Sequence, residues 1–233
     1  MSSKIHLQPA RAQDLPNIAD LAAQAMLEDE LCAWLCPQRH EHFADFRYAF
    51  LRRLKMRFVA PGYVMMVAVE QLDEDPHGRI FVERKLLDIE NGYLSWVYPD
   101  RSVDPHRLEH YKTASAAVDC FPFSAFPELW YLGHLAVDPK HQRRGIGRQL
   151  VEWGLQQARQ EEVCVGLEAS IKGTGLYEKL GFHTINTKDL TPEIAIQAMV
   201  QESPRSWLSA PRPDLANTCG YFNHSIFYVA IAH

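Results

Sequence analysis

The chain has 233 residues, of which 47% are hydrophobic and 23% are charged, an ordinary composition for a globular protein. Its 24 Lys and Arg against 29 Asp and Glu give a formal net charge of −5, which disfavours a dedicated nucleic-acid binder, since such proteins usually carry a basic excess. No run reaches the ~20 apolar residues needed to cross a membrane, and the N-terminus has no apolar signal core. We therefore expect a soluble, cytoplasmic protein that binds neither nucleic acid nor membrane.

The N-terminal half alternates short strands with amphipathic helices. The expected elements are a strand at 4–9, a helix capped by Asp14 and running to about Met26, a helix at 41–57, strands at 63–72, 79–89 and 92–98 with a turn at 73–78, and a helix at 105–119. The run at 63–72 is continuously apolar, which is typical of a strand buried on both faces.

Five cysteines are spread along the chain, and this odd number suits a reducing compartment better than a disulfide framework. Cys32 and Cys36, with His40 and His42 nearby, suggest half of a zinc site, but no second ligand pair with metal-like spacing follows. We therefore expect no metal, and a buried turn of helix around Trp34.

The C-terminal half continues the alternation. The expected elements are an aromatic, proline-rich loop at 120–128, a strand at 129–137, a helix at 145–161, a strand at 163–169, a short helix at 173–180, a strand at 182–186, a helix at 191–200, an irregular loop at 203–221 and a strand at 225–232. Without repeats or an obvious linker, one mixed α/β domain over 1–233 is the economical interpretation. The last strand could pair within the chain or with a second subunit, so a homodimer stays open.

The segment VDPKHQRRGIGR, residues 137–148, places two glycines at the start of a helix, although glycine costs roughly 1 kcal/mol against alanine in a helix interior. The first N–H groups of a helix lack intrahelical partners and carry partial positive charge, so they can bind a diphosphate. Gly145 and Gly147 would let its oxygens approach the backbone, and neighbouring arginines would add charge-assisted contacts. The alternative is a helix start with a solvated basic face.

Two nucleotide-binding patterns are excluded in this segment. A P-loop needs Gly-Lys followed by Ser or Thr, and the chain has none. The dinucleotide pattern G-x-G-x-x-G fails because Gly147 is followed by Arg148, Gln149 and Leu150. A different ligand with a diphosphate is therefore indicated.

The segment Gln142–Gly147, "QRRGIG", matches the Q/R-x-x-G-x-G/A motif of the GNAT acetyltransferase superfamily. The preceding "LGHLAVDP" (132–139) resembles the fourth strand of that family, and "LEASIKGTGLYEKLGF" (167–182) resembles its fifth strand and the helix that follows. The two motifs have the right order and separation, which makes the pair much more specific than either alone. The resemblance is strong over about 129–186, and the chain as a whole resembles fungal small GNAT proteins.

This resemblance implies a mixed, mostly antiparallel twisted sheet, flanked by helices and splayed between its fourth and fifth strands, with acetyl-CoA as co-substrate. Backbone groups of Leu135, Ala136 and Val137 would bind the pantetheine arm. The pyrophosphate would be held by Gln142, Arg143, Arg144, Gly145, Ile146, Gly147 and Arg148. Ser170 stands where many members of the family have an asparagine that contacts the cofactor arm, and a hydroxyl makes a smaller contact.

The implied reaction is N-acetyl transfer, in which a neutral amine attacks the thioester carbonyl. A backbone N–H on the strand at 131–137 could stabilise the oxyanion, and Tyr177 occupies the family's position for the acid that protonates the leaving sulfur. Tyr177 could also serve as a buried aromatic that anchors its helix. Glu168, if burial raises its pKa, and His134 are the two base candidates, each of which could instead be structural. Water could also take the proton.

Family acceptor sites lie where this chain has its poorly matched segments, 26–43, 120–128 and 220–228. The acidic residues Glu28, Asp29 and Glu30 could attract a cationic amine, and a solvated helix end explains them equally well. Aromatic residues that could line a pocket, or simply pack in the core, are Trp34, Trp96, Phe121, Phe123 and Phe126. We expect a small-molecule amine as acceptor; the alternatives are a protein lysine or N-terminal acetyltransferase and a non-catalytic acyl-CoA-binding sensor.

Overall fold

The computed structural model describes residues 5–69, 99–117, 120–126, 128–202 and 223–231. Its sheet has the strand order β1-β2-β7-β3-β4-β6-β5. The strands are β1 (His6–Pro9), β2 (Tyr63–Val69), β3 (Glu128–Leu135), β4 (Cys164–Ser170), β5 (His183–Thr191), β6 (Ile194–Gln201) and β7 (Asn223–Ile231). The helices are α1 (Leu15–Ala25), α2 (Glu30–Leu35), α3 (Phe43–Phe58), α5 (Pro105–Ala117), α6 (Ile146–Glu161) and α7 (Thr174–Glu178), with short 3-10 turns η1 (Ala12–Asp14), η2 (Phe123–Ala125) and η3 (Pro139–His141).

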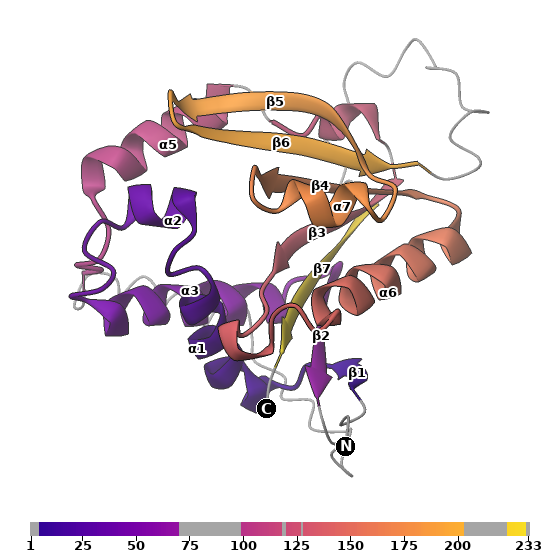
Figure 1. Cartoon of the computed structure of the whole chain (residues 1–233), viewed down its shortest axis with the longest axis horizontal. Coiled ribbons are helices and arrows are strands. Elements are labelled where there is room, and N and C mark those ends of the chain that lie inside the picture. Colours follow the sequence, from indigo (N-terminus) through magenta and orange to yellow (C-terminus); the bar gives the residue numbers. More distant parts are fainter. Residues whose placement is uncertain (1–4, 70–98, 118–119, 127, 203–222, 232–233) are drawn as a thin grey trace.

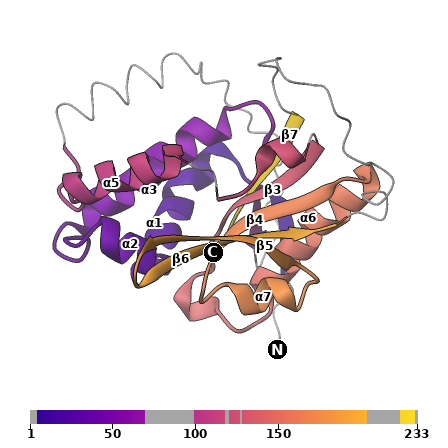
Figure 2. The ribbon, with the colours of Figure 1, turned by 90° about the horizontal axis from the view of Figure 1, so that it is seen from above.

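Helices cover both faces of the sheet. Helices α1 and α3 lie on one face and α6 lies on the other (Figures 1 and 2). Antiparallel pairs form the two ends of the sheet, β1-β2 and β4-β6-β5, whereas β2, β7, β3 and β4 run parallel to one another in its centre. The predicted mixed α/β fold, with a sheet flanked by helices, is confirmed.

The C-terminal strand β7 lies in the middle of the sheet. It pairs with β2 on one side and with β3 on the other, and both pairings are parallel. The predicted terminal strand therefore pairs within the chain. This insertion ties the last described residues to strands from both halves of the chain, which suits a single domain.

One predicted element is wrong. Residues 191–200 were expected to form a helix, but they contain the end of β5, a turn and all of β6 except Gln201. Strand β6 is hydrogen-bonded to β4 on one side and to β5 on the other. The hydroxyl of Thr191 accepts hydrogen bonds from the backbone N–H groups of Glu193 (3.3 Å) and Ile194 (3.1 Å), which closes the β5–β6 turn around Pro192. Pairing on two edges outweighs the local helical pattern, because strand formation depends strongly on tertiary context.

Smaller differences concern boundaries and caps. Asp14 makes no side-chain cap on α1; its carboxylate instead accepts the backbone N–H of Arg11 at 2.7 Å. Strand β5 runs beyond the predicted end at 186 to Thr191. The predicted strands at 79–89 and 92–98, the turn at 73–78, the loop at 203–221 and Trp96 lie outside the described residues.

Two hydrophobic clusters lie on opposite faces of β3 and β4. The main core contains Trp130 and Val165, on the α6 side, where the indole N–H of Trp130 donates to Glu161 of α6 at 2.8 Å. A smaller cluster on the other face contains Phe121, Leu129 and Cys164. Because side chains alternate along a strand, these assignments fix which face each later residue of β3 and β4 presents.

No described helix combines the length and apolar content that crossing a membrane requires.

Candidate active site

Strands β3 and β4 stop pairing with each other before either strand ends. Their ladder stops at Leu132 and Leu167, although the strands continue to Leu135 and Ser170. Beyond that point β3 stays paired with β7, and β4 stays paired with β6. The predicted splay between these two strands is confirmed, and it leaves backbone groups of both strands without each other as partners.

A β-bulge at Gly133 redirects the last residues of β3. Leu132 is opposite Phe227 of β7, and His134 is opposite the next residue, Tyr228, so Gly133 is the extra residue. Since successive residues of a strand face opposite sides, Leu132 and His134 point to opposite faces of the sheet. Leu132 is on the α6 side, so His134 points toward α3. The ring of His134 accordingly lies 5.9 Å from the ring of Phe50 on α3.

Helix α6 begins with a residue that needs to be glycine. Gly145, at the N-cap position, has φ 80° and ψ 3°, in the left-handed region that costs other residues roughly 1–2 kcal/mol. No side chain caps this helix, and the first bond of the helix is donated by Gln149 to the carbonyl of Gly145. The N–H groups of the first turn are therefore available to an external acceptor.

Gly147 lies where β3, α6 and α7 meet. A β-carbon built on it would lie 3.4 Å from Cγ2 of Val137, 3.8 Å from Cδ2 of Leu135 and 3.8 Å from Cδ2 of Leu176. These are ordinary contact distances, so packing within the protein does not by itself demand glycine at this position. A ligand that approaches the backbone would demand it. The structure thus brings the two predicted cofactor segments, 135–137 and 145–148, into contact.

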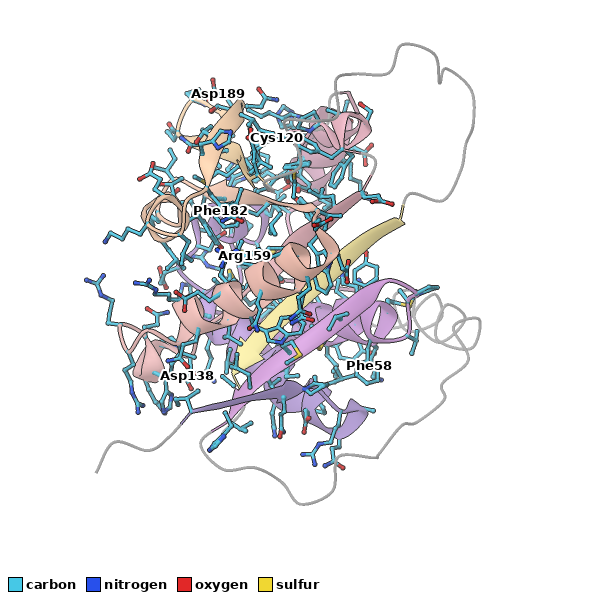
Figure 3. The ribbon with its side chains drawn as sticks, turned by 90° about the vertical axis from the view of Figure 1, so that its right-hand side faces the viewer. Phe58, Cys120, Asp138, Arg159, Phe182 and Asp189 are labelled. Carbon is cyan, nitrogen blue, oxygen red and sulfur yellow. The ribbon has the colours of Figure 1, made fainter. Side chains whose placement is uncertain are left out.

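The loop between β3 and α6 is held by its own polar groups. The Asp138 carboxylate is buried and accepts the backbone N–H of Lys140 at 2.7 Å. The side-chain amide of Gln142 donates to the carbonyl of Val137 at 3.1 Å. Figure 3 shows Asp138 near the N-terminal end of α6 and Arg159 farther along the helix. Gln142 therefore shapes this loop through its side chain.

Some of the remaining predicted cofactor residues are buried and the others are exposed. Ala136 and Ile146 are buried, so they could meet a ligand through their backbone. Arg143 and Arg144 are exposed, and Arg143 adopts a positive φ of 62°. Arg148 is exposed and forms an ion pair with Glu152 at 2.8 Å. A ligand at the start of α6 would therefore be bound mainly by backbone amides. The three arginines are exposed, and Arg148 is already paired with Glu152.

Tyr177 and Ser170 both lie next to Gly173, which follows the end of β4. A β-carbon on Gly173 would lie 3.5 Å from Cε2 of Tyr177 and 3.7 Å from Oγ of Ser170. Tyr177 is buried and packs edge-to-face on Phe182, with ring centroids 5.8 Å apart. Burial raises the pKa of Tyr177, so its phenol is protonated at neutral pH and can donate a proton. The tyrosine can therefore anchor α7 and act as a proton donor.

Glu168 is an exposed residue on β4, so its predicted burial is wrong. Its Oε1 accepts the backbone N–H of Phe121 at 3.0 Å, and its carboxylate also hydrogen-bonds the side chain of Tyr131. Burial raises the pKa of Tyr131, and the negative charge of Glu168 adds to this effect, so the phenol of Tyr131 is the donor in that bond. Glu168 is thus a solvent-accessible carboxylate held by two neighbouring groups.

His134 is neutral at physiological pH. Burial lowers its pKa to about 4, and the positive charges of Arg53 and Arg57 on α3 act in the same direction. Although His134 is only half-buried as a residue, its Nε2 atom is inaccessible to solvent. Since an alkylammonium has a pKa near 10.4, about six units higher, His134 is a poor acceptor for its proton.

The acidic residues expected to attract a cationic amine each have a partner within the chain. Glu28 lies 3.9 Å from the guanidinium of Arg39, and the Asp29 side chain accepts a backbone N–H at the start of α2. Glu30 forms an ion pair with Lys172, which follows β4, at 3.0 Å. Glu28 and Glu30 therefore each face a cation, whereas Asp29 caps α2.

The aromatic residues of the 120–128 loop pack mainly against one another and against β4. The ring of Phe121 lies 5.0 Å from Phe123, 5.4 Å from Phe126 and 5.5 Å from Tyr131. Phe121 is fully buried and fills the space where a side chain on Gly166 would be, since a β-carbon there would lie 2.3 Å from its Cζ atom. This loop thus packs in the core of the second cluster. Trp34, elsewhere, packs against His110 of α5 with ring centroids 5.8 Å apart.

Within the part of the chain that is described, no group of three or more His, Cys, Asp or Glu side chains could hold a metal ion. Burial raises the pKa of the Cys32 thiol to about 12 and also raises that of Cys36. Both thiols are therefore protonated at neutral pH.

Three residues of this region, Arg53, Arg57 and Tyr131, were missed from the sequence. Arg53 and Arg57 are four residues apart on α3, on the face that also carries Phe46 and Phe50. The helical period of the predicted helix at 41–57 already put both arginines on its apolar face, which is the signal that could have found them.

Known proteins resemble this chain in sequence and in structure. The family model for the acetyltransferase (GNAT) domain matches residues 108–184. An acetyltransferase of Stachybotrys chartarum is 24% identical over 221 residues, which cover 84% of this chain and 87% of that protein. A shorter match, 37% identical over 67 residues, covers 29% of this chain and 23% of the uncharacterized N-acetyltransferase YitH of Bacillus subtilis.

A crystal structure described as histone acetyltransferase HPA2 and related acetyltransferase, from Corynebacterium glutamicum, shares the fold with a TM-score of 0.54. It is 20% identical and covers 85% of this chain and 96% of that one. The matched domain contains β3, α6, β4 and α7, which together build the parted strands and the uncapped helix start. GNAT enzymes use acetyl-CoA as co-substrate and act on amines. Residues 108–184 thus match a GNAT acetyltransferase domain, and over most of its length the chain resembles a fungal acetyltransferase.

Proposed function

We propose that this enzyme moves an acetyl group from the thioester of acetyl-CoA to the amine of a small molecule by direct attack. The observation that carries the proposal is the parting of β3 and β4 between two features, the uncapped start of α6 at Gly145 and the buried phenol of Tyr177. One feature suits the diphosphate of the co-substrate, and the other suits its sulfur.

The diphosphate would bind at the first turn of α6. Its oxygens would accept the N–H groups of residues 146–148, which have no side-chain cap. The positive φ of Gly145 turns the chain into this helix, and the missing β-carbon at Gly147 leaves its backbone approachable. The exposed Arg143 and Arg144 would add positive charge. Leu135 and Val137, beyond the β3–β4 ladder, would bind the pantetheine arm through backbone groups.

The acetyl transfer requires one bond to form and one to break. The neutral amine attacks the thioester carbon, a C–N bond forms, and the carbonyl oxygen becomes an oxyanion that a backbone N–H of residues 133–137 would stabilise. The C–S bond then breaks, and the sulfur receives a proton from Tyr177. The proton that the amine nitrogen loses restores the phenol by way of a base or water, so no proton is gained or lost overall.

We favour Glu168 over His134 for its charge and accessibility rather than for its basicity, because a glutamate carboxylate is ordinarily as weak a base as this histidine. Glu168 is negatively charged and accessible, so it would also attract the ammonium form of the acceptor. His134 carries no charge at neutral pH, and the nearby positive charges of Arg53 and Arg57 oppose its protonation. We propose that His134, on the same face of β3 as Tyr131, packs against Phe50 and so helps to position α3.

The first test is a calorimetric titration of the purified protein with acetyl-CoA, with ATP and NAD as controls, followed by an amine screen that measures release of free CoA. Selective binding of acetyl-CoA with turnover of small amines supports the proposal. Binding without turnover of any small amine or lysine peptide would indicate a sensor instead. A preference for peptides would indicate a protein acetyltransferase.

The role of Tyr177 is tested by Tyr177→Phe, which removes only the hydroxyl. General acid catalysis contributes about 100-fold or more, so kcat should fall by that order while the affinity for acetyl-CoA stays the same. Tyr48→Phe, on the outer side of α3, is the matched control. An unchanged kcat in Tyr177→Phe would exclude the phenol as the acid.

A further inference from the structure

The side of the parted strands that faces α3 carries positive charge. Arg53 and Arg57 lie one helical turn apart on the face of α3 that holds Phe46, Phe50 and Leu54 in the core. The bulge at Gly133 turns His134 toward the same helix. Residues from two distant parts of the chain thus meet where β3 leaves β4.

Arg53 has a fixed position at this place. Its guanidinium lies 4.5 Å from the centre of the Phe50 ring, and the same ring lies 5.9 Å from His134. Its Nε donates to the carbonyl of Ala49 at 3.2 Å. Among the described residues these contacts of Arg53 are with a ring and a carbonyl, so they hold the cation without neutralising its charge. The guanidinium is exposed and can meet a ligand.

Arg57 adds a second positive charge beside Arg53 and is more buried than Arg53. It is half-buried, and its pKa is lowered by burial and by the charge of Arg53, which is the expected result when two cations share a site. Tyr63 and Tyr131 act on it in the opposite direction. A pair of cations that burial and mutual repulsion disfavour is better tolerated when an anion binds between them.

The same face also carries the carboxylate of Glu168, at a separate place. Tyr131 precedes the bulge and His134 follows it, so the two share a face of β3. Tyr131 bonds to Glu168 on β4 and also interacts with Arg57 on α3. The order along this face is therefore a carboxylate, a phenol and two guanidinium groups. A ligand with a cationic amine at one end and an anion at the other matches that order.

We propose that the acceptor is an amine that also carries a carboxylate, as a free amino acid does, with its amine toward Glu168 and its carboxylate toward Arg53 and Arg57. This proposal rests on the proposed function and names its substrate class. The guanidinium groups would bind the carboxylate through charge-assisted hydrogen bonds, which are stronger than neutral ones.

The test compares matched acceptors. Leucine, β-alanine and 4-aminobutyrate place one, two and three carbon atoms between amine and carboxylate, and each is paired with its primary amide and with the amine that lacks the carboxylate. With release of CoA as readout, at least one carboxylate acceptor should exceed its two partners by about 10- to 100-fold in kcat/KM. If every amide and simple amine equals or exceeds its carboxylate partner, the proposal is wrong.

Variants locate the effect. Arg53→Gln and Arg57→Gln should each remove most of this preference, because kcat/KM should fall much further for the carboxylate acceptors than for the simple amines. Arg57→Lys, which keeps the charge, should retain part of it. Arg52→Gln is the control, because Arg52 lines a separate hollow with Asp45 and Asp100. Unchanged discrimination in both Gln variants, with folding verified by circular dichroism, would also overturn the proposal.

Direct binding separates this proposal from the proposed function. Calorimetric titration with the same carboxylates needs no turnover, and their affinity should fall about 10-fold or more in Arg53→Gln. Arginine-dependent binding without acetyl transfer to any amine would refute the proposed function and retain the anion site. Acetyl transfer to amines with no arginine-dependent preference would retain the function and refute the anion site.

Discussion

Replacement of Gly166 by alanine tests the packing that holds Glu168. A β-carbon at this position would lie 2.3 Å from Cζ and 2.5 Å from Cε2 of Phe121. Ordinary contact between carbon atoms begins near 3.5 Å, so the ring would have to move by about 1.2 Å. Phe121 is fully buried among Phe123, Phe126 and Tyr131, which leaves it little room to move.

The expected cost follows from overpacking. Extra carbon in a well-packed core costs about 1–3 kcal/mol. For a chain of this length, 1 kcal/mol corresponds to about 2–4 °C, so the Tm of Gly166→Ala should fall by about 2–12 °C in thermal unfolding followed by circular dichroism. The backbone N–H of Phe121 also bonds to Glu168, so turnover should fall while the affinity for acetyl-CoA is retained.

A double-mutant cycle identifies the contact. Phe121→Leu removes the ring atoms that meet the new β-carbon, so Gly166→Ala should cost less in that background. Gly175→Ala is the control, because a β-carbon there meets nothing within 4 Å. A Tm within 1 °C of the parent protein for Gly166→Ala, or equal costs in both backgrounds, would refute the reasoning.

The remaining predictions concern the co-substrate, the base and the response to pH. Gly145→Asp should bind acetyl-CoA at least about 10-fold more weakly in calorimetry than Gly145→Asn, since asparagine tolerates a positive φ and lacks the charge; equal affinities would argue against a diphosphate here. Glu168→Gln should lower kcat/KM and change the pH–rate profile, whereas an unaltered profile would favour water as the base. The pKa of His134 falls from 6.5 to about 4 on folding, so the unfolded chain binds more protons between these values and stability is lost as pH falls through this window. Denaturant titrations at pH 7 and pH 4.5 should differ by roughly 2 kcal/mol more in the parent than in His134→Asn, and an equal difference in both would contradict this assignment.

The cofactor half of the site follows from short-range sequence patterns. The basic segment with Gly145 and Gly147 predicted a helix start open to an anion, and α6 begins there without a side-chain cap. The ends of β3 and β4 were also expected to part, and they do so after Leu132 and Leu167. The helix start depends on residues close in sequence, so a motif could specify it, whereas the parting of the strands was expected from the family resemblance.

Long-range pairing was harder to predict. The helix expected at 191–200 is β6, because both of its edges find partners in β4 and β5. Glu168 was expected to be buried because apolar residues flank it on β4. Alternation along the strand puts those neighbours on the α6 side and Glu168 on the other, where it is exposed. Neither outcome is fixed by the residues alone, since each depends on which element lies alongside.

The bulge at Gly133 shows how one residue decides which side chains of β3 face α3. Without the extra residue, His134 would share a face with Leu132 and point toward α6. With it, His134 joins Tyr131 on the face toward α3, near Arg53 and Arg57. The helical period of the sequence placed both arginines on the apolar face of a predicted helix. Their proximity to His134 on β3 depends on a register shift that no local sequence pattern predicts. The uncapped helix start is therefore predicted by a motif, whereas the acceptor specificity that we propose depends on how α3 and the bulged strand face each other.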